Sequence, residues 1–120
     1  MSLFNETLLW LMKRRMPRIE EHFKNPLELQ HTSLDELIFS GRNTEWGKKY
    51  GYSEIGNYEQ FKAKVPISTY EEIFPYIDRM MHGEQNVLWA SPISWFSKSS
   101  GTTNARSKFI PVSKESLENC

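Results

Sequence analysis

The chain has 120 residues, enough for one modest domain, and its apolar runs are all shorter than the roughly 20 residues of a membrane span. Its 15 basic residues balance 15 acidic ones, so we expect neither a nucleic-acid partner nor a membrane partner. The single cysteine, Cys120, excludes an internal disulfide and leads us to expect a reducing, cytoplasmic location.

Two long helices are predicted at the start of the chain. Apolar residues recur at helical spacing over residues 3–24, and Pro17 should kink or divide this helix because it removes a backbone donor and clashes with the preceding turn. Asn25-Pro26-Leu27-Glu28 then combines a capping side chain, a proline at the first helical position and a glutamate three residues after the cap. This second helix should end at Gly41.

Three shorter helices are predicted next, each after a capping residue. Their ranges are about 45–49, 58–64 and 70–83, with caps at Thr44, Asn57 and Ser68 or Thr69. Trp46 and Tyr50 should pack into the core, and Gly83 should cap the last of these helices.

Strands are predicted only in the last third of the chain. Their ranges are Val87–Trp89, Ile93–Ser97 and Lys108–Val112, and Ser113 should then cap a final helix. The expected fold class is therefore α/β, mostly helical, with a strand–loop–strand element near the C-terminal end. A two-stranded hairpin is marginal alone, so we expect further strands of the sheet to lie beyond residue 120.

The loop between the last two predicted strands carries the chemistry. Hydroxyl side chains surround Gly101, so backbone N–H and side-chain O–H donors can approach an anion closely. The cations of this segment are Lys98, Arg106 and Lys108. There is no acidic residue between Glu84 and Glu115, which favours phosphate as the ligand. An ordinary solvated hairpin loop is the alternative interpretation of this composition.

The Walker loop and the dinucleotide fingerprint both require further glycines that this loop lacks. Instead, Ser99-Ser100-Gly101-Thr102-Thr103 followed by Lys108-Phe109-Ile110-Pro111 resembles the plant auxin-responsive acyl-acid amido synthetases and their bacterial relatives, within the adenylate-forming superfamily. Thr44-Glu45-Trp46-Gly47 is similar to the same family. The generic adenylating loop ends in Gly-x-Pro-Lys, whereas this loop is one residue longer and lacks that glycine and proline. This departure favours the amido synthetases over the acyl-coenzyme A ligases.

The resemblance implies that the intact protein is an ATP-dependent acyl-acid amido synthetase. It would adenylate a carboxylic acid, release pyrophosphate and pass the acyl group to an amine, for which we expect an amino acid. The residues that would bind the ATP phosphates are Ser99, Ser100, Gly101, Thr102, Thr103 and Lys108. A coenzyme A ligase and a non-catalytic helical interaction module are the alternatives.

We expect residues 1–120 to be the N-terminal part of a larger adenylate-forming domain. Groups for the base, the ribose and Mg²⁺ would lie outside this segment, and the three histidines show no metal-ligand spacing. These residues alone should therefore be inactive, bind ATP weakly and self-associate through an exposed sheet edge.

Overall fold

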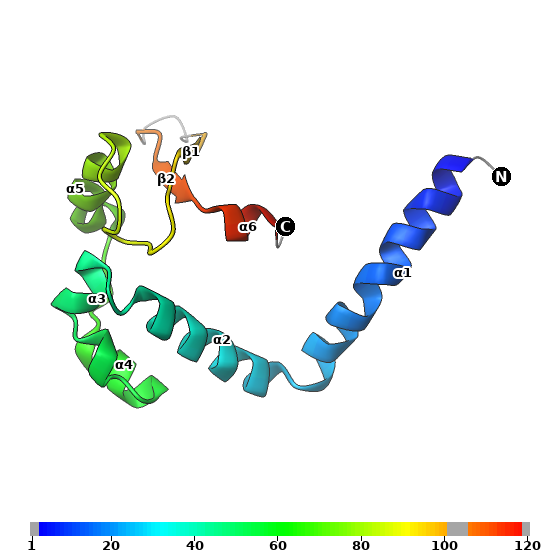
Figure 1. Ribbon diagram of the computed structural model, residues 1–120, viewed down its shortest axis with the longest axis horizontal. Helices are drawn as coiled ribbons and strands as arrows, with labels where there is room; N and C mark the ends of the chain where they lie inside the picture. Colours follow the sequence, from blue (N-terminus) through cyan, green and yellow to red (C-terminus); the bar gives the residue numbers. More distant parts are fainter. Residues whose placement is uncertain (1–2, 101–105, 119–120) are drawn as a thin grey trace. The chain divides into compact units, whose positions relative to one another are not determined.

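A computed structural model describes residues 3–100 and 106–118, apart from the side chains of residues 21 and 22 (Figure 1). The chain divides into two compact units between Leu34 and Asp35. Helices dominate the described residues, as the sequence predicts. The elements are α1 (Leu3–Lys24), α2 (Pro26–Gly41), α3 (Glu45–Lys49), the 3-10 helix η1 (Tyr52–Glu54), α4 (Tyr58–Lys64), α5 (Tyr70–Met81), β1 (Trp95–Lys98), β2 (Phe109–Val112) and α6 (Lys114–Glu118).

The first unit consists of α1 and the beginning of α2. Helix α1 continues through Pro17, so of the two predicted outcomes, a kink or a division, the division is wrong. A single proline removes one backbone donor, and the turns on either side keep their own hydrogen bonds. Helix α2 begins at Pro26 and ends at Gly41, as predicted. None of the helices in the described ranges is long and apolar enough to cross a bilayer.

Helix α3 is built around the sequence Thr44-Glu45-Trp46-Gly47. The Thr44 Oγ1 atom accepts a hydrogen bond from the Gly47 N–H at 3.0 Å and donates one to the Gly41 carbonyl at 2.6 Å. A Cβ atom at position 47 would lie 1.9 Å from that carbonyl oxygen, so only glycine allows α3 to fold back onto the end of α2. The Trp46 ring contacts the ring of Tyr76 in α5, with 5.4 Å between the centroids.

The segment Val87–Trp89 is irregular, so the prediction of a strand there is wrong. The Val87 carbonyl accepts a hydrogen bond from Trp46 N at 3.0 Å, and the Asn86 carbonyl accepts one from Glu45 N at 3.0 Å. These carbonyls satisfy N–H groups at the start of α3, which have no partner within their own helix. Val87 is buried, but its backbone pairs with a helix terminus rather than with a strand.

Helix α5 provides much of the core of the second unit. Thr69 and Glu72 form a capping box at its start, and Pro75 lies inside the helix. The C-cap is His82 rather than the predicted Gly83, which follows in the left-handed region at φ 101°. The buried core cluster consists of Met80, Val87 and Ile93, with Tyr76, Leu88, Trp89 and Phe96 packed against it.

Strands β1 and β2 pair antiparallel in a two-stranded sheet, the one sheet within the described ranges. Trp95 pairs with Val112 and Lys98 pairs with Phe109. Both strands are slightly shorter than predicted. The Ser113 Oγ atom accepts a hydrogen bond from Ser116 N at 3.1 Å, which confirms Ser113 as the cap of α6.

Candidate functional site

The predicted phosphate loop connects β1 to β2, and its base is closed by one pair of residues. Ser99 N donates to the Lys108 carbonyl at 2.9 Å, and Lys108 N donates to the Ser99 hydroxyl oxygen at 3.0 Å. This exchange continues the strand pairing by one position beyond Lys98 and Phe109. Ser99 and Lys108 therefore face each other where the loop leaves and re-enters the sheet.

The structure brings together some of the predicted site residues. Ser99 is half-buried, and Ser100 and Lys108 are exposed. The remaining predicted residues, Gly101, Thr102 and Thr103, lie outside the described residues, so their roles stay predictions. The Ser99 hydroxyl oxygen is engaged as an acceptor, which leaves its hydrogen available to donate to an anion.

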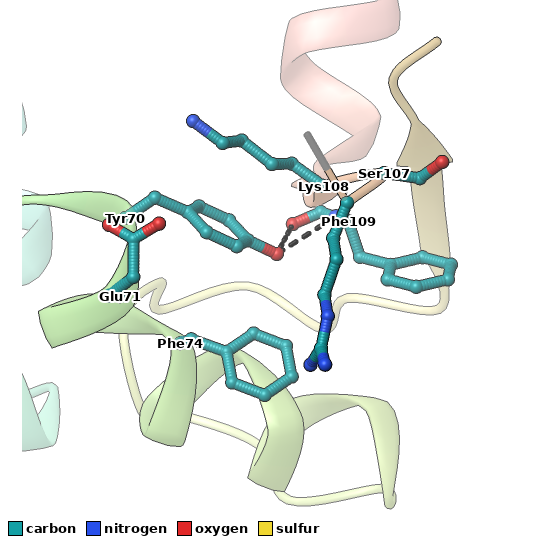
Figure 2. A pocket seen from close by; sticks show the side chains of 7 residues that line it. Tyr70, Glu71, Phe74, Ser107, Lys108 and Phe109 are labelled. Atoms are coloured by element: carbon teal, nitrogen blue, oxygen red, sulfur yellow. Dashed lines mark hydrogen bonds between the residues drawn. The ribbon is translucent and has the colours of Figure 1, made fainter. Parts of the chain in front are cut away.

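A pocket of about 630 Å³ lies between the start of α5 and the segment that leads from the loop into β2. Its lining residues are Tyr70, Glu71, Phe74, Arg106, Ser107, Lys108 and Phe109. Figure 2 shows the Tyr70 ring projecting from α5 toward the backbone of Phe109, with Phe74 lower in the same pocket. Glu71 of α5 adds a carboxylate to the lining of this pocket. The sequence around the loop did not predict it, because that segment contains no acidic residue.

The main polar contact across this pocket is made by Tyr70. Its hydroxyl oxygen accepts a hydrogen bond from Phe109 N at 2.8 Å, and its hydrogen is donated to the Phe109 carbonyl at 3.0 Å. From the sequence, Tyr70 was predicted only to be the first residue of a helix. The two residues are 39 positions apart, so no local pattern indicates the contact.

Two of the cations around the loop, Lys98 and Lys108, lie near aromatic rings. The Lys108 ammonium is 5.4 Å from the centre of the Tyr70 ring, and the Lys98 ammonium is 5.9 Å from that of Phe109. The salt bridges found within 3–100 and 106–118 involve neither these lysines nor Arg106. A phosphate group would thus not have to displace a carboxylate from them.

The same ranges hold no group of three or more His, Cys, Asp or Glu residues that could bind a metal ion. The donors around the loop are instead hydroxyls, backbone N–H groups and cations, which suit the oxygens of a phosphate rather than a magnesium ion. The donors around the loop therefore suit a phosphate, and the ligands of Mg²⁺ stay predicted to lie outside this chain.

Comparison with known proteins supports the resemblance seen in the loop. The solved structure of GH3.15 acyl acid amido synthetase superposes with a TM-score of 0.78 at 32% identity, covering 86% of this chain and 19% of that one. Indole-3-acetic acid-amido synthetase GH3.2 of Arabidopsis thaliana is 36% identical over 101 residues, which are 83% of this chain and 18% of the relative. The 4-substituted benzoates-glutamate ligase GH3.12 of the same plant is 33% identical over 103 residues, which are 85% of this chain and 18% of the relative.

The chain spans about a fifth of the length of these relatives. Its mostly helical fold matches the corresponding part of the solved structure. The family described as "GH3 family N-terminal domain" matches residues 15–120, and the chain belongs to this family.

Proposed function

We propose that the intact protein containing this chain is an ATP-dependent acyl-acid amido synthetase. A carboxylate oxygen attacks the α-phosphorus of ATP, the bond from that phosphorus to the bridging oxygen breaks, and pyrophosphate leaves. The nitrogen of an amine then attacks the acyl carbon, AMP leaves, and the nitrogen loses a proton as the amide forms. The names of the relatives include an indole-3-acetic acid-amido synthetase and a benzoate–glutamate ligase, so we propose a carboxylic acid and an amino acid as substrates.

The observation that carries this proposal is the pair that closes the loop. Ser99 and Lys108 are linked through both backbone N–H groups, and the Lys108 side chain is exposed. A lysine and a hydroxyl residue are therefore paired through their backbones at the mouth of a loop rich in hydroxyls. Donors arranged before the reaction stabilise the negative charge that develops on phosphate oxygens during adenylation.

Further parts of the reaction are proposed to lie outside this chain. They are the pocket for the base, the groups that bind the ribose and the ligands of Mg²⁺, an ion that would screen the charge of the phosphates.

Cytoplasmic location and self-association of the isolated chain also stay predictions. Tyr70 already occupies the outer edge of β2 at Phe109, and Pro111 has no N–H, so another strand would pair more readily with β1.

The test of the site uses two variants of the intact protein, Thr102→Ala and Lys108→Ala. Each removes one donor to the phosphates, which typically costs about 3 kcal/mol of transition-state stabilisation, or 10²–10³ in rate. Carboxylate-dependent exchange of pyrophosphate into ATP measures the adenylation step. The matched controls are Thr32→Ala in α2 and Lys62→Ala in α4. Both residues are exposed and neither belongs to the loop, so the exchange should be unchanged. Undiminished exchange in the loop variants would contradict the phosphate site.

A second measurement separates the amido synthetase from its two rivals. The intact protein is supplied with ATP and a carboxylic acid, together with either an amino acid or coenzyme A, and the product is identified by mass. An amide supports the proposal, and a thioester would replace it with the coenzyme A ligase. A non-catalytic module would gain no stability from ATP, whereas ligand at 100 times the dissociation constant should add about 2.7 kcal/mol to a binding protein.

A further inference from the structure

We propose that Tyr70 is a positioning residue for Lys108, and that its hydroxyl holds the first residue of β2, directly after the phosphate-binding lysine. The inference rests on the proposed function, because it assumes that Lys108 acts on phosphate. It assigns a role in this site to a side chain from α5, far from the loop in the sequence.

The backbone groups of Lys108 and Phe109 point to opposite edges of the chain where β2 begins. Lys108 directs its N–H and carbonyl toward Ser99 and hence toward β1. In antiparallel pairing, the backbone groups of successive residues face alternate sides, so those of Phe109 face away from β1. Tyr70 takes up both of these groups with one hydroxyl, at 2.8 Å and 3.0 Å. Lys108, just before β2, and Phe109, the first residue of β2, are thus held from opposite sides.

Helix α5 fixes the position of Tyr70. It is the first residue of α5 and lies within the capping box, in which Thr69 N donates to the Glu72 carboxylate at 2.7 Å. Ile77 and Met80 of the same helix are buried. The capped first turn and the buried face give Tyr70 a defined position relative to the core. Its hydroxyl transmits that position to Phe109 and so to the adjacent Lys108.

The Lys108 side chain also lies beside Tyr70. The Lys108 ammonium lies 5.4 Å from the centre of the Tyr70 ring, within the range of a cation–π interaction. Figure 2 shows the Lys108 side chain and the Tyr70 ring on the same side of the Phe109 backbone. The same residue therefore contacts the backbone next to Lys108 through its hydroxyl and lies beside the lysine's charged end through its ring.

The experiment measures ATP–pyrophosphate exchange by the intact protein carrying Tyr70→Phe, which keeps the ring and removes the hydroxyl. We expect kcat/KM for ATP to fall roughly ten- to hundredfold, because displacement of a catalytic group by about 1 Å can have such an effect. The matched control is Tyr76→Phe. Tyr76 lies on the same helix and its hydroxyl accepts a hydrogen bond from Lys49 Nζ at 2.8 Å, away from the loop. Exchange by this control should be unchanged.

A double-mutant cycle tests whether Tyr70 acts through Lys108. Once Lys108→Ala has removed the ammonium, adding Tyr70→Phe should lower the exchange rate by less than about threefold, since the two changes remove one shared effect. A general loss of structure would instead lower the rate by the same factor in both backgrounds and would overturn the inference. Normal exchange in Tyr70→Phe, alongside a defective Lys108→Ala enzyme, would overturn the inference and leave the proposed function standing.

A second variant keeps the test decisive if Tyr70→Phe does not fold. Phe109→Pro removes the N–H that donates to Tyr70, and it costs no hydrogen bond to β1 because that N–H faces away from it. Its exchange rate should fall as that of Tyr70→Phe does. A folded Phe109→Pro enzyme with normal exchange would contradict the inference. Normal exchange in Lys108→Ala would overturn the assignment of Lys108 to phosphate, and this inference with it.

Discussion

Helices α1 and α5 both carry apolar side chains at helical spacing, yet they differ in what becomes of those side chains. In α5, Ile77 and Met80 are 4% and 3% exposed and form part of the core. In α1, Leu8 and Trp10 are 48% and 61% exposed. Spacing of apolar residues is sufficient for a helix to be amphipathic, but burial requires a partner surface. Among the described residues, α5 has such a surface within its own unit, whereas every described residue of α1 is exposed.

The largest effect expected from this comparison is that of Met80→Ala in the core. Removing a nearly fully buried Met side chain should lower the free energy of unfolding of this chain by about 2–5 kcal/mol, because burial is lost and a cavity remains. Leu8→Ala in α1 should change it by less than about 0.5 kcal/mol, since this side chain is about half exposed and is not part of the core cluster. Urea unfolding followed by circular dichroism measures both.

The same two substitutions in the intact protein sharpen the comparison. If Leu8→Ala costs as much there as a core substitution, a further segment covers α1. If Leu8→Ala and Met80→Ala lowered the free energy of unfolding of this chain equally and by a large amount, the difference in burial between α1 and α5 would be contradicted.

A smaller effect is expected at the helix caps. Thr44 is 1% exposed and bonds both Gly47 N and the Gly41 carbonyl, so Thr44→Ala should destabilise the chain by about 1–2 kcal/mol. Asn57 caps α4 with the same chemistry but is exposed, and its side chain accepts a single bond from Gln60 N. Asn57→Ala should cost about 0.5–1 kcal/mol. Thermal unfolding of the two variants, compared side by side, tests whether burial strengthens a cap, and equal losses would refute it.

The smallest effect concerns pH. Arg79 of α5 forms a bidentate pair with Glu45 of α3, at 2.7 Å and 2.9 Å. This hydrogen bonding lowers the pKa of the Glu45 carboxyl below its ordinary value of 4.5. A lowered folded-state pKa contributes stability that is present above the unfolded-state value and is lost as the pH falls through the folded-state value. The advantage of the wild-type chain over Glu45→Gln should therefore shrink below about pH 4.5.

Urea midpoints between pH 3 and pH 7, on the order of one measurement per pH unit, follow this difference. In an Arg79→Met background, Glu45→Gln should have a much smaller pH-dependent effect, because the main cause of the lowered pKa is gone and only the charge of Lys49 remains. An undiminished effect in that background would show that Arg79 is not responsible.

The sequence by itself determined the elements whose signals are local. Thr44, Asn57 and Ser113 cap helices as predicted, and Thr69 is the cap of α5 from the predicted pair Ser68 and Thr69. These signals are local because a cap joins residues only three positions apart. The strand–loop–strand element was also predictable, since both strands are short β-prone runs that flank a glycine. The proposed phosphate chemistry of the loop likewise came from the sequence, through its hydroxyls and cations.

Tertiary structure decided the features that depend on distant partners. Val87 has a β-prone side chain, but its carbonyl bonds to Trp46 of α3, and that contact replaces a strand with irregular backbone. Tyr70 looks like any helical tyrosine in the sequence, and only the fold brings its hydroxyl to Phe109. Hydrogen bonds between residues about 40 positions apart leave no periodic trace in a sequence, because the pairing depends on how the whole chain packs.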